Sequence, residues 1–179
     1  MEKKAIVKIN VKNFDMYNGP HIISEDAQYD EDFYDEEDDY NDIEENDELV
    51  KAFDDNGLEF VTQGSIARRE GRLVLKYIET DASDMSNEVT TLSYDESDPS
   101  IITMERNGAC RTVMVFEAGK RYTCVYKIGG MALELIVRTY DFENKLTDCG
   151  GTISLGYTLE NGGSIISRVK MEVKVELVD

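Results

Sequence analysis

Short segments in which apolar and polar residues alternate make up most of the chain. In residues 4–12, Val7, Ile9 and Val11 lie on one face, and lysines and an asparagine lie on the other. A period of two residues is typical of a strand with one buried face. The pattern recurs in nine later segments: residues 58–69, 72–80, 89–94, 101–106, 109–116, 121–128, 131–141, 152–160 and 164–178. It therefore predicts ten strands.

Turn sequences rich in glycine join most of these strands. They are Glu70-Gly71, Asn107-Gly108, Glu117-Ala118-Gly119, Gly129-Gly130 and Asn161-Gly162-Gly163. Such short connections favour antiparallel pairing, because a parallel return needs a long crossover. The last segment is long enough to pair with both its predecessor and the first strand, and closure removes exposed sheet edges. We therefore predict an all-β antiparallel meander closed into a barrel of about eight to ten strands.

The alternation also predicts which side chains point into this barrel. Most of them are bulky enough to fill the interior, so one possibility is a barrel packed by its own side chains. A cavity for one small ligand is the alternative. The predicted inward set includes Leu73, Leu75, Tyr77, Ile102, Met104, Met114, Phe116, Leu133, Leu135, Val137, Ile153, Leu155, Tyr157 and Leu159.

The acidic charge is concentrated in one segment. Of 179 residues, 38 are acidic and 19 basic, and residues 25–48 hold 15 of the carboxylates without a lysine or arginine. We expect one domain, residues 1–179, with the barrel from residues 1–12 and 58–179 and an acidic, mostly irregular insertion at residues 13–57. A short helix is predicted at residues 44–53. The insertion is either a solvated spacer or, through Tyr29, Phe33, Tyr34 and Tyr40, a segment that docks onto a basic, partly apolar surface.

Composition excludes several classes of function. A pI near 4.3 argues against nucleic-acid partners and anionic membranes, although the nearly neutral barrel weakens the first exclusion. No apolar run approaches the roughly 20 residues of a membrane-spanning helix, and no signal peptide precedes the first strand, so we expect a cytoplasmic protein. The insertion lacks the glycine of an EF-hand loop, so no metal site is predicted.

Catalytic motifs do not stand out. His21 is the single histidine, and Ser65, Ser154 and Ser167 lie in strand patterns without a nucleophile elbow. Cys110, Cys124 and Cys149 form no Cys-x-x-Cys pair, so free thiols are expected, with Cys149 in a turn and the most reactive. A disulfide between Cys110 and Cys124 is the lesser alternative. We therefore predict neither an enzyme nor a bound cofactor.

Several segments together resemble a known family. They are GRLVLKYIET at residues 71–80, TTLSYDE at 90–96, VFEAGKRYTCVY at 115–126, LELIVRT at 133–139 and GGTISLGYTLENGG at 150–163. In order and spacing they resemble the YwiB-like bacterial family of uncharacterised proteins. The resemblance implies a calycin-like, that is lipocalin-like, antiparallel barrel in a small cytoplasmic protein, and it implies no activity. Residues 126–130 depart from the family pattern, because they lack its Thr-Pro pair and are one residue shorter.

The barrel interior is the place where a function is expected. The hypothesis is a small amphipathic ligand, held in the barrel or at its mouth, whose carboxylate accepts hydrogen bonds from an arginine. The ordinary alternative for each polar residue is a surface salt bridge or a solvated hydroxyl. An interaction module that uses the acidic insertion to hold a basic protein partner is the other hypothesis, and the chain is expected to be a monomer or a homodimer. The candidate ligand-binding residues are Tyr77, Arg106, Arg121, Tyr126, Arg138 and Tyr157.

Overall fold

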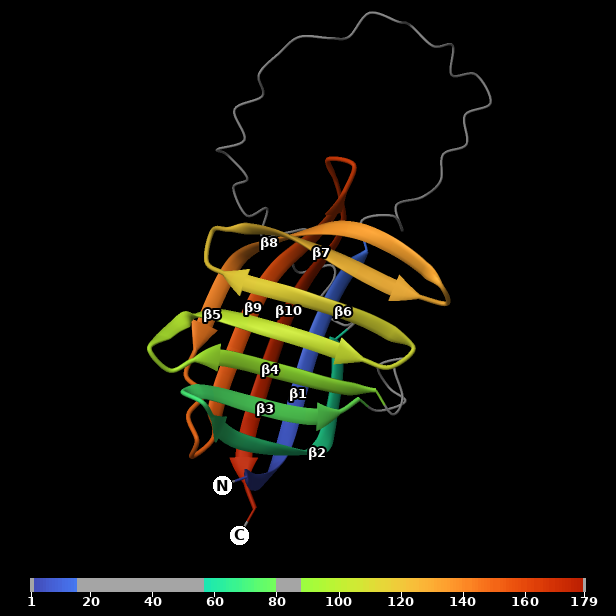
Figure 1. Cartoon of the computed structure of the whole chain (residues 1–179). Coiled ribbons are helices and arrows are strands. Elements are labelled where there is room, and N and C mark those ends of the chain that lie inside the picture. Colours follow the sequence, from blue (N-terminus) through green and yellow to red (C-terminus); the bar gives the residue numbers. More distant parts are fainter. Residues whose placement is uncertain (1, 16–56, 80–87, 179) are drawn as a thin grey trace, which may run out of the picture.

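Ten antiparallel strands follow one another around a closed barrel in the computed structural model (Figure 1), which describes residues 2–15, 57–79 and 88–178. The predicted all-β meander and its closure are confirmed. His21, the acidic segment 25–48 and the helix predicted at residues 44–53 lie outside the described residues. The strands are β1 (Glu2–Asp15), β2 (Gly57–Arg69), β3 (Arg72–Ile78), β4 (Val89–Asp95), β5 (Asp98–Asn107), β6 (Cys110–Glu117), β7 (Arg121–Ile128), β8 (Met131–Asn144), β9 (Gly151–Asn161) and β10 (Ser164–Leu177).

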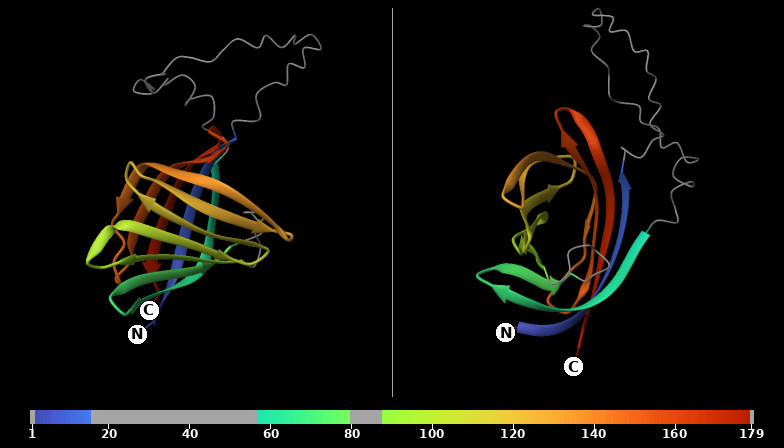
Figure 2. Two further views of the ribbon diagram at one scale, coloured as in Figure 1. Left: turned by 45° about the horizontal axis from the view of Figure 1, so that its top comes forward. Right: turned by 90° about the vertical axis from the view of Figure 1, so that its right-hand side faces the viewer.

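The first strand closes the barrel. Ala5 of β1 lies opposite Leu177 of β10 on one side and opposite Gly64 of β2 on the other. In Figure 1, β1, β9 and β10 run steeply behind β3 to β7, which cross in front of them. The right-hand view of Figure 2 looks into the end of the barrel at which β3, β5 and β7 finish.

The middle of the barrel is filled by its own side chains. Leu75, Ile102, Met104, Met114 and Phe116 each have an exposed fraction of 0%. A water-sized hollow beside any of them would leave part of its surface accessible, so the centre is packed as closely as an ordinary protein core. The inward-facing residues predicted from the alternation form most of this core.

Leu133 differs from the other predicted inward residues because it is 46% exposed. It lies opposite Tyr126, and its neighbour two residues on, Leu135, is buried opposite Cys124. Leu133 thus keeps the inward phase of β8. It is exposed because it lies close to the β7–β8 hairpin, at the end of the barrel.

Two glycines form the β7–β8 hairpin, where the chain departs from the family pattern. Ile128 pairs with Met131 across Gly129 and Gly130, whose φ angles are 56° and 86°. Two successive left-handed residues are the conformation of a type I′ turn, which matches the twist of the strands it joins. The Gly-Gly sequence therefore forms a tight two-residue turn.

The cysteines are free, as predicted. Cys110 and Cys124 are buried on β6 and β7, whereas Cys149 is exposed. In the described residues, no helix is long and apolar enough to cross a membrane.

Candidate ligand-binding site at one end of the barrel

A row of inward-facing residues crosses five neighbouring strands at one end of the barrel. Gly64 of β2 lies opposite Tyr77 of β3, Tyr77 opposite Thr90 of β4, and Thr90 opposite Arg106 of β5. Arg106 in turn lies opposite Thr112 of β6. We call these five residues the arginine layer. Antiparallel register places them side by side although they span nearly fifty positions of the sequence.

Two further tyrosines act on the charge of Arg106 from other parts of the barrel wall. Tyr157 of β9 is 3% exposed and packs against Phe116, with 4.9 Å between the ring centroids. Tyr126 of β7 is half-buried, and its hydroxyl contacts the sulfur of Met114 at 3.2 Å. Tyr77, Tyr126 and Tyr157 all act electrostatically on the Arg106 guanidinium. Four of the predicted ligand-binding residues are thus brought together.

One donor of Arg106 has no partner. Its Nε is buried without a hydrogen-bond acceptor, and Arg106 forms no ion pair within the described part of the chain. The hydroxyl of Thr112 opposite it is also buried without a partner. Unpaired buried donors are uncommon in native structures, because each loses its hydrogen bonds to water.

Electrostatic surroundings keep Arg106 charged. Burial is the largest influence and on its own would lower the pKa of Arg106. Glu79 and, at high pH where they ionise, the three tyrosines outweigh it, so the pKa lies above its usual value. Burial also raises the pKa of Tyr77, Tyr126 and Tyr157. At neutral pH the site therefore presents one cation surrounded by neutral hydroxyl groups.

Two buried carboxylates lie one layer nearer the end of the barrel. Glu79 follows Tyr77 by two residues and Glu88 precedes Thr90 by two residues, so both continue the inward phase of their strands. They are 4% and 6% exposed. Two residues of a strand span about 7 Å, which is the expected spacing of the two layers along the strands. We call Glu79 and Glu88 the carboxylate layer.

Hydrogen bonds fix one oxygen of each carboxylate. Glu79 Oε1 accepts a hydrogen bond from Thr90 Oγ1 at 2.7 Å, and Glu88 Oε1 accepts one from the Cys110 amide at 2.9 Å. The Glu79 amide also donates to the Glu88 carbonyl at 2.8 Å. The second oxygen of Glu88, Oε2, is buried and has no hydrogen-bond partner in the described structure.

Exposed apolar side chains surround the β7–β8 hairpin beside these layers. Ile128, Met131 and Leu133 are 51%, 75% and 46% exposed. Ile128 lies opposite Cys110, and Leu133 lies opposite Tyr126. We call these three residues the apolar rim, because they extend the inward face of the barrel wall into solvent next to the arginine layer.

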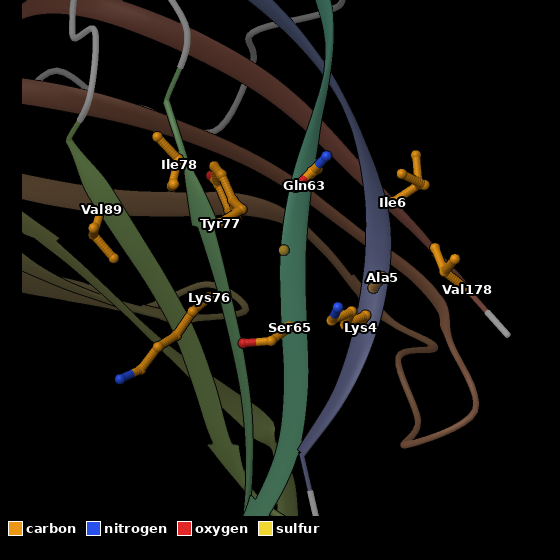
Figure 3. A pocket seen from close by; sticks show the side chains of 11 residues that line it. Lys4, Ala5, Ile6, Gln63, Ser65, Lys76, Tyr77, Ile78, Val89 and Val178 are labelled. Carbon is orange, nitrogen blue, oxygen red and sulfur yellow. The ribbon is translucent and has the colours of Figure 1, made fainter.

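A groove of about 470 Å³ lies on the outside of the barrel over β1, β2 and β3. Figure 3 shows Ser65 between Lys4 and Lys76, in agreement with the strand register. Gly64 and Tyr77 belong to both the groove lining and the arginine layer. The backbone of β2 and β3 therefore forms the wall between the two. The groove lining also includes Ile6, Ile78, Val89 and Val178.

The structure places the other two predicted site residues elsewhere. Arg121 and Arg138 lie opposite each other on β7 and β8, and both are exposed. Their neighbours Tyr122 and Val137 are on the more buried face of these strands, and Arg121 forms an ion pair with Glu160. Neither arginine joins the arginine layer.

Sequence reasoning missed Glu79, Glu88, Thr90 and Thr112 as members of the site. A signal for Glu79 was present in the alternation, because Leu73, Leu75 and Tyr77 point inward and residue 79 is the next position in phase. Glu88 lies one residue before the strand predicted from Val89, so the alternation assigns it no face.

Comparison with known proteins gives a family and a fold. The family described as "Domain of unknown function (DUF1934)" matches residues 45–173. The crystal structure of the ywiB protein from Bacillus subtilis matches with a TM-score of 0.65 at 18% sequence identity, covering 99% of this chain and 94% of that chain. No curated protein matches the chain. The expected relationship to YwiB-like proteins is confirmed, and the structural likeness extends over the whole barrel.

Proposed function

The chain belongs to the DUF1934 family, whose description assigns no activity, and from the geometry of the barrel we propose that it binds a small amphipathic acid at the arginine layer. The carboxylate of the ligand accepts hydrogen bonds from Arg106 and from tyrosine hydroxyls beside it. The apolar body of the ligand lies against the apolar rim.

The unpaired Nε of Arg106 is the observation that supports this proposal most strongly. A guanidinium presents parallel N–H donors that match the two oxygens of a carboxylate. Nε is covered in the free protein, so side chains around it have to move before a carboxylate can supply the acceptor that the described residues do not supply. The carboxylate also gives the half-buried guanidinium an ion pair, which Glu79 does not form in the described structure although it acts electrostatically on Arg106.

The packed centre of the barrel determines where the ligand's apolar body can lie. Leu92, Met104 and Met114 are at most 1% exposed directly beneath the arginine layer, so a chain cannot extend deeper without displacing them. Ile128, Met131 and Leu133 are already exposed to solvent on the same end. Covering them with a ligand removes apolar surface from water, at about 25 cal/mol for each Å².

We propose binding without catalysis, a cytoplasmic location and a monomeric or homodimeric state as parts of the same account. The other hypothesis, that the acidic insertion holds a basic protein partner, rests on residues outside the described structure. It stays a prediction from the sequence.

Isothermal titration calorimetry with decanoate tests the proposal. Decanoate should bind the wild-type protein saturably, and R106M should weaken binding about tenfold or more, because a hydrogen bond to a charged group contributes about 1.5 to 3 kcal/mol. R138M is the matched control, since Arg138 is exposed and outside the arginine layer. Equal binding by wild type and R106M, or no binding by wild type, would contradict the proposal.

A further inference from the structure

We infer that the ligand's head group is zwitterionic, with an ammonium group on Glu88 and a carboxylate on Arg106; this inference rests on the proposed function. The arginine layer and the carboxylate layer are stacked along the same strands, with the carboxylates nearer the end of the barrel. A ligand that approaches from that end meets Glu79 and Glu88 on its way to Arg106. Its head group therefore encounters negative charge first and positive charge second.

Charge balance argues against a simple anion. Arg106 contributes one positive charge, and the carboxylate layer contributes two buried carboxylates, of which that of Glu79 acts electrostatically on Arg106. A carboxylate alone gains the attraction of Arg106 but meets repulsion from both glutamates at low local dielectric. An additional ammonium group on the ligand is attracted by the glutamates, and this attraction offsets the repulsion of the carboxylate.

Glu88 has a buried acceptor without a partner, and its carboxylate is held in place. Its Oε1 is held by the Cys110 amide at 2.9 Å, while Oε2 is buried and unpaired among the described residues. Its side chain also packs over Gly108, where an added Cβ would lie 2.4 Å from Glu88 Cγ. The carboxylate is thus held against the β5–β6 turn with one oxygen left to accept a hydrogen bond. An ammonium group donates such hydrogen bonds.

Two of the unpaired atoms at this end of the barrel have opposite requirements. Arg106 Nε needs an acceptor, and Glu88 Oε2 needs a donor. Once the side chains that cover these atoms move aside, a head group with both a carboxylate and an ammonium group satisfies the two atoms together. A fatty acid satisfies only Arg106, and an alkylamine satisfies only Glu88.

Three probes that share one alkyl body test this inference: decanoate, 2-aminodecanoate and decylammonium. Calorimetry with wild-type protein should show 2-aminodecanoate binding about tenfold or more tightly than decanoate, as expected for one added charge-assisted hydrogen bond. E88Q should reduce the difference between these two probes to within about threefold, because the added partner has lost its charge. E134Q is the control, because Glu134 is exposed on β8, and it should leave the ratio unchanged.

The possible outcomes separate the two claims. If decanoate binds wild type as tightly as 2-aminodecanoate does, or if E88Q leaves their ratio unchanged, the zwitterion is wrong and the proposed acid-binding function still stands. If none of the probes binds, or if decylammonium binds as tightly as 2-aminodecanoate, the proposed function itself fails. The comparison of probes on wild-type protein requires no variant to fold.

Discussion

Replacing Arg106 with methionine should stabilise the free protein. If Arg106 serves a ligand, the barrel carries a half-buried guanidinium whose Nε has lost water and gained no acceptor. Methionine fills a similar volume and needs no hydrogen bond. The substitution therefore relieves the desolvation of the unpaired donor.

The size of the effect follows from that one atom. An unsatisfied buried donor costs about 1 to 3 kcal/mol, and methionine removes this cost. Loss of attraction between Arg106 and Glu79 opposes the gain, but the two form no ion pair in the described structure. We expect a net increase in the free energy of unfolding of about 1 kcal/mol, which raises the Tm of a chain of this length by roughly 2–4 °C.

Urea unfolding and differential scanning calorimetry of wild type, R106M and R138M measure this change. R138M should stay within about 0.5 kcal/mol of wild type, as usual for an exposed substitution. If Arg106 were instead needed to hold the barrel together, removing it would leave Glu79 as an uncompensated buried charge and cost about 3 to 5 kcal/mol. A loss of stability of that size in R106M would refute the reasoning.

Three more predictions concern the barrel and its titrating groups. G64A should lower the free energy of unfolding by about 1 to 3 kcal/mol, because the added Cβ would lie 2.6 Å from the Lys76 carbonyl oxygen and 2.7 Å from Val7 Cγ2. In G57A the added Cβ would lie 3.6 Å from the nearest atom, so the free energy of unfolding should change little. Equal urea midpoints for G64A and G57A would contradict this difference. Iodoacetamide should modify one cysteine of the native protein, the exposed Cys149, because burial raises the pKa of Cys110 and Cys124. If mass spectrometry finds Cys110 or Cys124 alkylated before Cys149, this prediction is wrong. Burial raises the folded-state pKa of Tyr77 and Tyr157 above the value in the unfolded chain. Above about pH 10 the unfolded chain therefore binds fewer protons than the folded barrel, and the free energy of unfolding should fall as the pH rises. The fall should be shallower in Y157F, and parallel pH profiles for wild type and Y157F would rule this cause out.

Strand alternation made most of the barrel predictable. Each strand carries its own period of two, and the intervening turns are too short for anything but antiparallel pairing. The interior could be assigned from the same pattern, because inward phase and burial coincide along β3, β5 and β6. Leu133 shows the limit, because phase tells which way a side chain points but not whether the barrel covers it.

The site was predictable only in part. Arg121 and Tyr126 are five positions apart on one strand, and residues at odd separations face opposite sides, so β7 could not turn both of them inward. The meeting of Tyr157 with Arg106 depends on how β9 crosses the barrel from β5, which no local pattern contains. Glu79 and Glu88 lie at strand ends, where charged residues are ordinarily solvated, and the alternation alone does not show that the barrel buries both.

The Nε–H resonance of Arg106 in an NMR titration with decanoate tests the central claim most directly. Arg106 Nε is the unpaired donor on which the proposed function depends. We predict that its resonance shifts saturably as decanoate binds, while the Nε–H resonances of the exposed Arg121 and Arg138 do not move. A resonance of Arg106 that stays in place at saturating decanoate, or that moves no further than those of the exposed arginines, would contradict the account.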